Sequence, residues 1–142
     1  KIEVKNSTEC YIYVFGKETD GTSYTLFPYP EASDPSKTKY APFCGITGYR
    51  LFPKDKSMTP DSIGAKDMMA VVVSKQPLDW YNLNQTISRQ PQSDFATRVN
   101  NTLRTQASSG IRYESTTTGT IQFRGAAADN QVAACVIEIS KQ

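Results

Sequence analysis

The 142 residues match the length of one ordinary domain, which commonly runs to roughly 100–150 residues, and we expect a single domain over 1–142. A hydrophobic share of 38% with 21% charged residues excludes a disordered composition. The net charge of +2 is too small a surplus for a nucleic-acid-binding face, and no apolar run approaches the roughly 20 residues of a membrane span.

The first clear strand covers residues 10–15, Cys-Tyr-Ile-Tyr-Val-Phe. Alternate residues point to opposite faces of a strand, and here both faces are apolar. We therefore expect this strand inside a sheet that is covered on both sides. A turn signal at 20–21 (Asp-Gly) and the run 24–27 then predict a hairpin that ends at Pro28.

Two loops separate this hairpin from the second clear strand. Residues 28–42 hold four prolines among polar residues and 54–64 are polar, so we expect both loops on the surface. Between them, 49–53 is typical of a short strand that stops at a proline. Residues 66–74 are again apolar on both faces and predict a second central strand.

The apolar spacing then becomes helical. Asp79 can cap a short helix that stops before Pro91. Ser93 or Asp94 can start a second helix, which the Ser-Ser-Gly run at 108–110 ends. The stripes that we expect to face the core are Trp80, Leu83 and Ile87 in the first helix and Phe95, Val99 and Leu103 in the second.

The last third returns to alternation, with strands expected at 111–113, 121–124 and 132–139. The turns between them predict an antiparallel meander with one solvated side. The whole order predicts a mostly β fold, a β-sandwich or partly open barrel of about seven strands with a two-helix segment at about 79–107. A ferredoxin-like α+β layer is the alternative.

The three cysteines, Cys10, Cys44 and Cys135, are far apart, and their spacing matches no metal or redox motif. We interpret them first as buried free thiols that pack as small apolar residues. One disulfide, from three possible pairings, is the alternative and would indicate an oxidising compartment. A reactive thiol is the third interpretation.

The chain contains no histidine. This removes the Ser-His-Asp triad, the Cys-His pair and histidine metal sites. The acidic residues are dispersed, and the spacing of Asp61 and Asp67 gives no reason to place them as a catalytic pair, so we interpret them as solvated or capping groups. No phosphate-loop, dinucleotide or calcium-loop motif occurs. We expect a protein that is not an enzyme and that holds no cofactor and no metal.

Aromatic residues are abundant, with eight Tyr, six Phe and one Trp. Several stand close to the proline-rich loops, and Tyr and Trp offer large contact areas to a partner. The alternative is that they fill a β core and its rim. The candidate binding surface consists of Tyr29, Tyr40, Tyr49 and Trp80.

Four stretches together are similar to a known family. They are Tyr-Ile-Tyr-Val-Phe at 11–15, Tyr-Thr-Leu-Phe-Pro at 24–28, Gly-Tyr-Arg-Leu-Phe-Pro at 48–53 and Asp-Met-Met-Ala-Val-Val-Val-Ser-Lys-Gln-Pro at 67–77. Their order resembles the bacterial family called domain of unknown function 4384, over about residues 9–79. The resemblance implies a non-catalytic module that accompanies caspase-like peptidases, kinases or helical repeat proteins, or that occurs in exported proteins. The long loop 28–42 departs from the short Asn-rich stretch of that family.

We therefore expect a non-catalytic binding or adaptor module of an exported bacterial protein, in the periplasm or at the cell surface, with a protein or glycan partner. A cytoplasmic location is the alternative. Because the chain begins at Lys1 within a strand-like pattern, we expect it to be a mature or excised piece. A second hypothesis is a structural domain that supports a neighbouring catalytic domain of the parent chain. A third is a carboxylate-dependent hydrolase, which needs two converging acids, one with a raised pKa.

Overall fold

The computed structural model describes residues 2–46, 50–53, 58–59, 61–125 and 127–141, and within them the expected mostly β fold with a two-helix segment is confirmed. Its sheets do not close into a barrel. The nine strands are β1 (Ile2–Val4), β2 (Cys10–Lys17), β3 (Ser23–Phe27), β4 (Phe43–Cys44), β5 (Arg50–Phe52), β6 (Lys66–Ser74), β7 (Arg112–Ser115), β8 (Ile121–Arg124) and β9 (Val132–Ser140). The two helices are α1 (Trp80–Arg89) and α2 (Phe95–Leu103).

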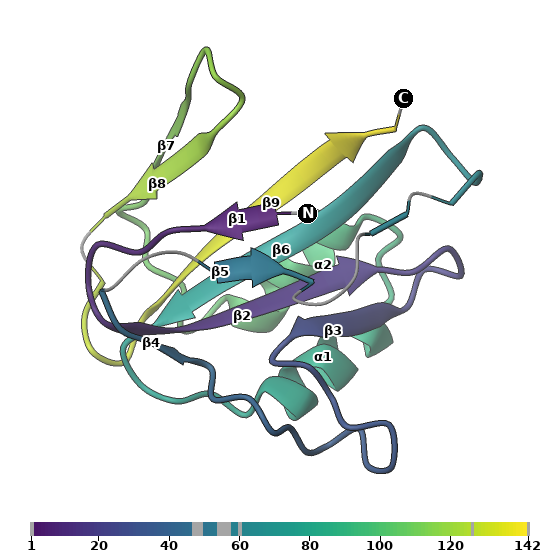
Figure 1. Ribbon diagram of the computed structural model, residues 1–142, viewed down its shortest axis with the longest axis horizontal. Helices are drawn as coiled ribbons and strands as arrows, with labels where there is room; N and C mark the ends of the chain where they lie inside the picture. Colours follow the sequence, from purple (N-terminus) through teal and green to yellow (C-terminus); the bar gives the residue numbers. More distant parts are fainter. Residues whose placement is uncertain (1, 47–49, 54–57, 60, 126, 142) are drawn as a thin grey trace.

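An antiparallel sheet in the order β3-β2-β6-β9 forms the centre of the molecule (Figure 1). β2 pairs with β6 along one side from Tyr11 to Gly16. On its other side, the first residues of β2 pair with β4 and the last ones with β3. The expected hairpin of β2 and β3 is confirmed, with Gly21 in the turn at a φ of 88°, a conformation that suits glycine.

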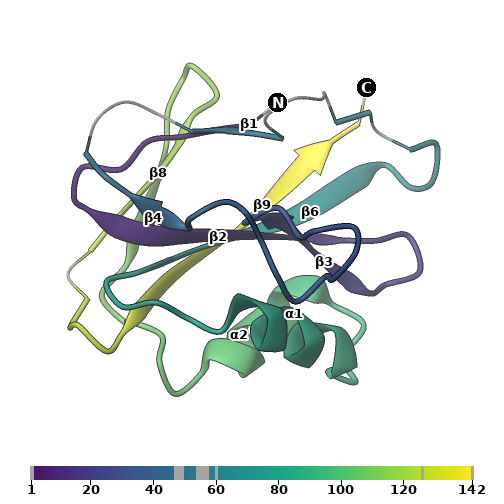
Figure 2. The same cartoon turned by 60° about the horizontal axis from the view of Figure 1, so that its bottom comes forward.

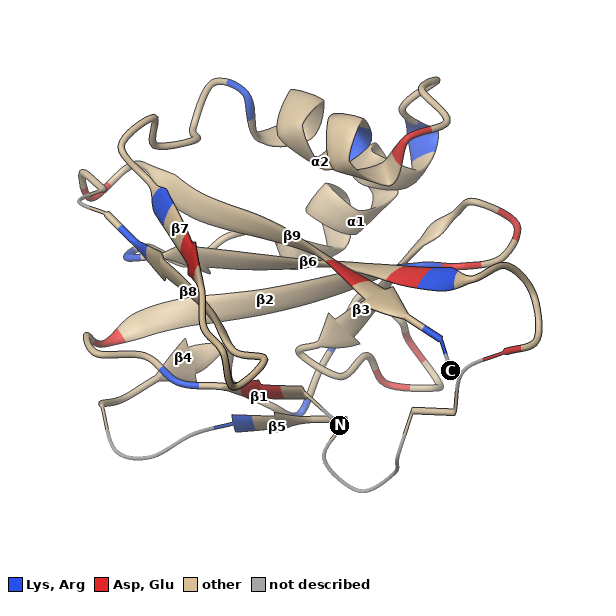
Figure 3. Cartoon of the chain, turned by 90° about the horizontal axis from the view of Figure 1, so that it is seen from above, with Lys and Arg blue, Asp and Glu red and all other residues tan. Residues whose placement is uncertain are grey.

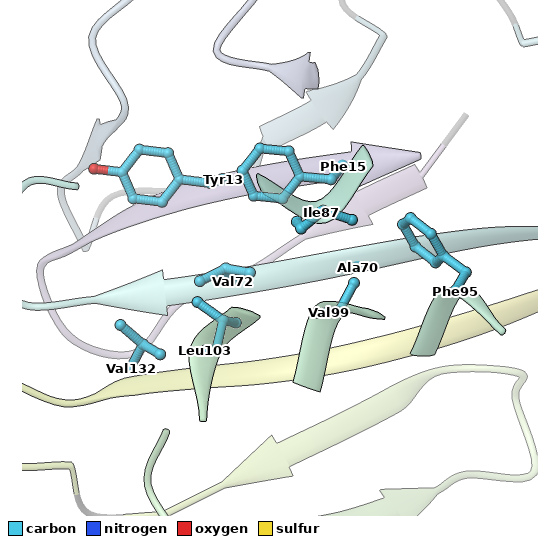
Figure 4. Packing of buried hydrophobic residues seen from close by; sticks show 9 residues of the cluster. All are labelled: Tyr13, Phe15, Ala70, Val72, Ile87, Phe95, Val99, Leu103 and Val132. Atoms are coloured by element: carbon cyan, nitrogen blue, oxygen red, sulfur yellow. The ribbon is translucent and has the colours of Figure 1, made fainter. Parts of the chain in front are cut away.

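Both faces of this sheet are covered, as the two doubly apolar strands predict (Figure 2). On one face, α1 and α2 pack over Tyr13 and Phe15 of β2 and Ala70 and Val72 of β6; Figure 4 shows these side chains from close by. On the other face lies the short β1-β5 ribbon. A second cluster of buried residues forms there, made of Cys10, Ile12, Val14, Phe27, Cys44, Phe52 and Val71.

The two helices begin where the capping residues predict. The Asp79 carboxylate accepts a hydrogen bond from the Asn82 N–H at 3.0 Å, and Asp94 accepts one from the Thr97 N–H at 2.8 Å. The expected stripes face the sheet, with Ile87, Phe95, Val99 and Leu103 fully buried and Trp80 and Leu83 packed at the edge of the cluster.

The second helix ends earlier than the Ser-Ser-Gly signal predicts. α2 stops at Leu103, and the chain then pairs with the start of β9. The Val132 N–H donates to the Gln106 carbonyl at 2.8 Å, and the Ser108 N–H donates to the Val132 carbonyl at 2.9 Å. The backbone groups of residues 106 and 108 therefore hydrogen-bond to β9 instead of forming a further helical turn. The end of the second helix, expected at 108–110, is thus wrong by several residues.

The predicted meander of the last three strands is also wrong. β7 and β8 pair only with each other among the described residues, whereas β9 pairs with β6 from Lys66↔Ser140 to Ser74↔Val132. One face of β8 carries polar side chains, and the residues of this strand are largely exposed. Beside β6, however, β9 buries Val132 and Cys135 and adds apolar contacts to both faces of the sheet. The larger burial of apolar surface explains this choice of partner.

Candidate functional site

The loop from Pro28 to Pro42, between β3 and β4, folds back on itself. The Glu31 N–H donates to the Lys37 carbonyl at 2.9 Å and closes the neck of the loop. At its tip, the Asp34 carboxylate accepts from the Ser36 hydroxyl at 2.6 Å and from its N–H at 3.1 Å. These hydrogen bonds to Ser36 lower the pKa of Asp34. The long loop that the prolines predict is therefore shaped by its own polar groups.

A row of aromatic rings joins this loop to the core. Tyr40 meets Tyr29 edge-on with ring centroids 5.0 Å apart, and Tyr29 meets Phe27 edge-on at 5.5 Å. Phe27 in turn lies 4.9 Å from the buried Phe52 ring. The Tyr29 hydroxyl also donates to the Leu51 carbonyl at 3.4 Å. Edge-to-face pairs of this kind are favourable, so the core holds the tyrosines in place.

The two tyrosines form one wall of a shallow hollow of about 360 Å³, which we call the aromatic hollow; it is lined by residues 29–33, 39 and 40. The lining combines the two rings with the oppositely charged side chains of Glu31 and Lys39 and with the hydroxyl of Ser33. Tyr40 is 37% exposed. This mixture can hold an apolar group and hydrogen-bond the polar groups beside it.

Of the four aromatic residues expected to form a binding surface, the three that the structure describes fall in two places. Tyr29 and Tyr40 come together at the aromatic hollow. Trp80 begins α1, meets Tyr81 edge-on at 6.1 Å and packs against the cluster on the helical face, whereas Tyr29 packs against the cluster on the other face. Tyr49 lies outside the described residues.

No family model, curated protein or solved structure matches this chain. The choice of site therefore depends on geometry and chemistry. By those criteria the aromatic hollow is the first candidate, because it gathers two of the residues that composition and loop position single out.

A second hollow, of about 400 Å³, lies where the β2-β3 turn meets the two helices, and sequence reasoning missed it. Its lining includes Lys17, Asp20 and Arg98. Arg98 is only 4% exposed, and its Nε and Nη2 atoms have no hydrogen-bond partner among the described residues. Its guanidinium carbon stands 5.6 Å from the centre of the Phe95 ring. A helical stripe reveals Phe95 but gives no signal that the neighbouring arginine is buried.

The spacing of Asp61 and Asp67 did not predict that they lie together, but both carboxylates contact the ammonium group of Lys141. Lys141 Nζ lies 2.5 Å from the Asp61 carboxylate and 2.9 Å from that of Asp67, and it also donates to the Ile63 carbonyl at 2.8 Å. Figure 3 shows the acidic and basic segments meeting where β6 begins and β9 ends. Lys141 lowers the pKa of Asp61, whereas a general acid needs the opposite shift. The cluster is therefore an ion-pair network.

Within the described part of the chain, no three His, Cys, Asp or Glu side chains are grouped so that they could hold a metal ion. Among the same residues, neither helix has the length and apolar character needed to cross a membrane. Cys10, Cys44 and Cys135 are all buried, and each is a free cysteine in this structure.

Proposed function

We propose that this chain is a non-catalytic binding module that takes a segment of a partner polypeptide into the aromatic hollow. The observation that carries the proposal is the Tyr29–Tyr40 pair, which is built on buried Phe27 and opens to the surface beside Glu31 and Lys39. Tyrosines with polar neighbours are the common anchors of protein interfaces.

The wall of the aromatic hollow is preformed, because contacts within the protein already hold its residues in place. Tyr29 contacts Phe27, Tyr40 and the Leu51 carbonyl, and the loop neck is closed by the Glu31–Lys37 hydrogen bond. A side chain that is already ordered loses little conformational entropy on binding. The site can therefore hold a partner with few contacts, which suits an adaptor.

The arrangement favours a polypeptide over a glycan. Tyr29 and Tyr40 meet at an interplanar angle of 75° and make a corner instead of an open flat platform. A corner receives one side chain, and Glu31 and Lys39 can serve the N–H and C=O groups on either side of it. A glycan partner is an outcome that the experiment below separates.

An exported bacterial setting is part of this proposal. It is supported by the resemblance of about residues 9–79 to the accessory domains described above. Those modules accompany other domains, so the partner segment can belong to the same parent chain or to another protein. The Asp61–Asp67 cluster does not favour the hydrolase hypothesis, because the hydrogen bond from Lys141 lowers the pKa of Asp61, whereas a general acid needs a raised one.

The test pans a phage-displayed random peptide library against the immobilised protein and measures the affinity of the selected peptides. We expect Tyr40→Ala to weaken binding about tenfold or more, the usual size of an aromatic anchor. Tyr81→Ala is the matched control, because Tyr40 and Tyr81 are both 37% exposed but Tyr81 is on α1. Equal affinities for the two variants would contradict the site. Binding of chitin or cellulose oligosaccharides alone, lost in Tyr40→Ala, would contradict a polypeptide partner.

A structural role beside a neighbouring domain is the second candidate, and the β7-β8 hairpin favours it. The hairpin projects from the central sheet (Figure 1), and Tyr113 and Ile121 are 54% and 46% exposed. The strand register places both residues on the same face of the hairpin, and exposed apolar residues that lie together mark contact surfaces. Deleting the domain from its parent protein is then expected to lower the melting temperature of the neighbour, and an unchanged neighbour would exclude this role.

A further inference from the structure

Cys10 and Cys44 occupy directly opposite positions in the antiparallel pairing of β2 with β4. Such residues point to the same face of a sheet, with Cα atoms about 4.5–5.5 Å apart. Disulfide-bonded cysteines have Cα atoms about 4.4–6.8 Å apart. Both side chains belong to the same buried cluster. The register of β2 and β4 therefore places these two cysteines within reach of each other for a disulfide.

Cys135 is out of reach of both. It lies opposite Val71, which lies opposite Val14 of β2. Two strand spacings and four residues along the strand thus separate Cys135 from Cys10. With about 4.8 Å between strands and about 3.4 Å per residue, their Cα atoms are about 17 Å apart. Cys44 is farther still, because β4 lies on the other side of β2.

We propose that Cys10 and Cys44 form an intramolecular disulfide, with Cys135 left as the free thiol. Each thiol gives up its hydrogen, one S–S bond forms, and two electrons and two protons pass to the oxidant. A small-molecule disulfide such as oxidised glutathione is a sufficient oxidant, because its own S–S bond breaks to give two thiols. The exchange proceeds by thiolate attack through a mixed disulfide.

The surroundings make this a structural bond. Burial raises the pKa of Cys10 to about 11 and also raises that of Cys44, although the nearby Arg50 guanidinium acts in the opposite direction. Arg50 is held there by a 2.8 Å hydrogen bond to the Phe43 carbonyl. In the folded chain the reduced thiols are therefore poor nucleophiles, and the finished bond is shielded from reductants. Opening of the two-residue strand β4 gives the oxidant access.

The bond also acts on the aromatic hollow. It closes the segment 10–44, which contains β3 and the whole loop 28–42. Cross-linking the ends of such a segment restricts the unfolded chain and stabilises the folded one. The second end of the loop would then be fixed by a covalent bond as well as by the short β4 ladder.

The test treats the fully reduced, folded protein with oxidised glutathione, alkylates it with iodoacetamide in denaturant and digests it with trypsin. The three cysteines fall in separate tryptic peptides, 6–17, 40–50 and 125–141. We expect two of the three thiols to escape alkylation, peptides 6–17 and 40–50 to be joined, and the oxidised protein to melt at a higher temperature than the reduced protein.

Three variants complete the test. Cys135→Ala should give the same linked peptides and the same rise in melting temperature. Cys10→Ala and Cys44→Ala should show neither. Three alkylated thiols after oxidation, a link that involves peptide 125–141, or bonds only between chains would each overturn the proposal. Because the first measurement uses the unmodified chain, it stands even if a variant fails to fold.

Discussion

The Tyr24 ring fills the space beside Gly16, its cross-strand partner in the β2-β3 hairpin. A Cβ atom at position 16 would overlap the ring and hydroxyl of Tyr24. Glycine weakens a strand when nothing packs on it, and an aromatic ring across the ladder restores that contact. This pair fixes how β3 lies on β2 and therefore where the loop 28–42 begins.

Gly16→Ala is therefore expected to destabilise the protein. Overpacking of this kind costs about 1–3 kcal/mol. Urea denaturation measures the change in the free energy of unfolding. Gly45→Ala is the control, because a Cβ there would meet no atom within 4 Å, and its effect should stay within about 0.5 kcal/mol. A tolerated alanine at position 16 would contradict the account, because it would show that the Tyr24 ring does not hold this position firmly.

Tyr13→Phe removes one hydroxyl from the core and should lower the free energy of unfolding by about 1–2 kcal/mol. The buried Tyr13 hydroxyl accepts a 2.8 Å hydrogen bond from the Leu78 N–H just before α1, and that donor would lose its partner. Tyr81→Phe is the surface control and should leave stability unchanged. Equal stability of Tyr13→Phe and the parent protein would mean that Leu78 is satisfied in another way.

The ion pairs of Lys141 with Asp61 and Asp67 should stabilise the fold only within a certain pH range. Asp61 has a lowered pKa, so its contribution is present above the ordinary carboxyl pKa and is lost as pH falls through the lowered value. Lys141 has a raised pKa, caused by Asp61 and Asp67, so its contribution is lost only as pH rises through that value. Stabilisation should extend between about pH 4 and about pH 10.5.

Thermal melts of Lys141→Met measure this window. The variant should melt below the parent protein at neutral pH, and the gap should narrow toward both ends of the range. Lys75→Met removes the longer, exposed Lys75–Asp129 pair, whose nitrogen and oxygen are 3.5 Å apart, and should change the melting temperature less. A gap that does not depend on pH would show that Lys141 acts through packing alone.

Arg98→Met is expected to raise the free energy of unfolding by about 1 kcal/mol. Two nitrogens of the guanidinium, Nε and Nη2, are buried without a hydrogen-bond partner in the described structure, and buried donors of this kind are unfavourable. Methionine is shorter than arginine, but its unbranched apolar side chain can pack against Phe95 without burying a charge. Arg112→Met, on the exposed strand β7, should have little effect. If Arg98→Met lowers stability instead, the guanidinium has a partner in solution.

Much of the fold could be predicted from local patterns. The double apolar alternation of 10–15 and 66–74 identifies the two central strands, because only a sheet covered on both faces can bury such residues. The capping residues Asp79 and Asp94 locate both helix starts. These features depend on residues within a few positions of one another, which is why the sequence reveals them.

Pairing between distant segments could not be predicted. β9 joins β6 instead of its neighbour in sequence, and the two-residue strand β4 is too short to leave a pattern. The same limit applies to the candidate site. Loop position singled out Tyr29 and Tyr40, but the meeting of Asp61 and Asp67 at Lys141 and the opposition of Cys10 and Cys44 depend on long-range register.

The central claim is that a sheet covered on both faces, with β2 and β6 at its centre, forms the stable core of the protein. Hydrogen exchange measured by mass spectrometry tests this claim most directly. Amides of β2 and β6 should exchange most slowly, because they open only with global unfolding. The β7-β8 hairpin, which is largely exposed, should exchange much faster. If β2 or β6 exchanged as fast as that hairpin, the central sheet, and with it the placement of the aromatic hollow, would be contradicted.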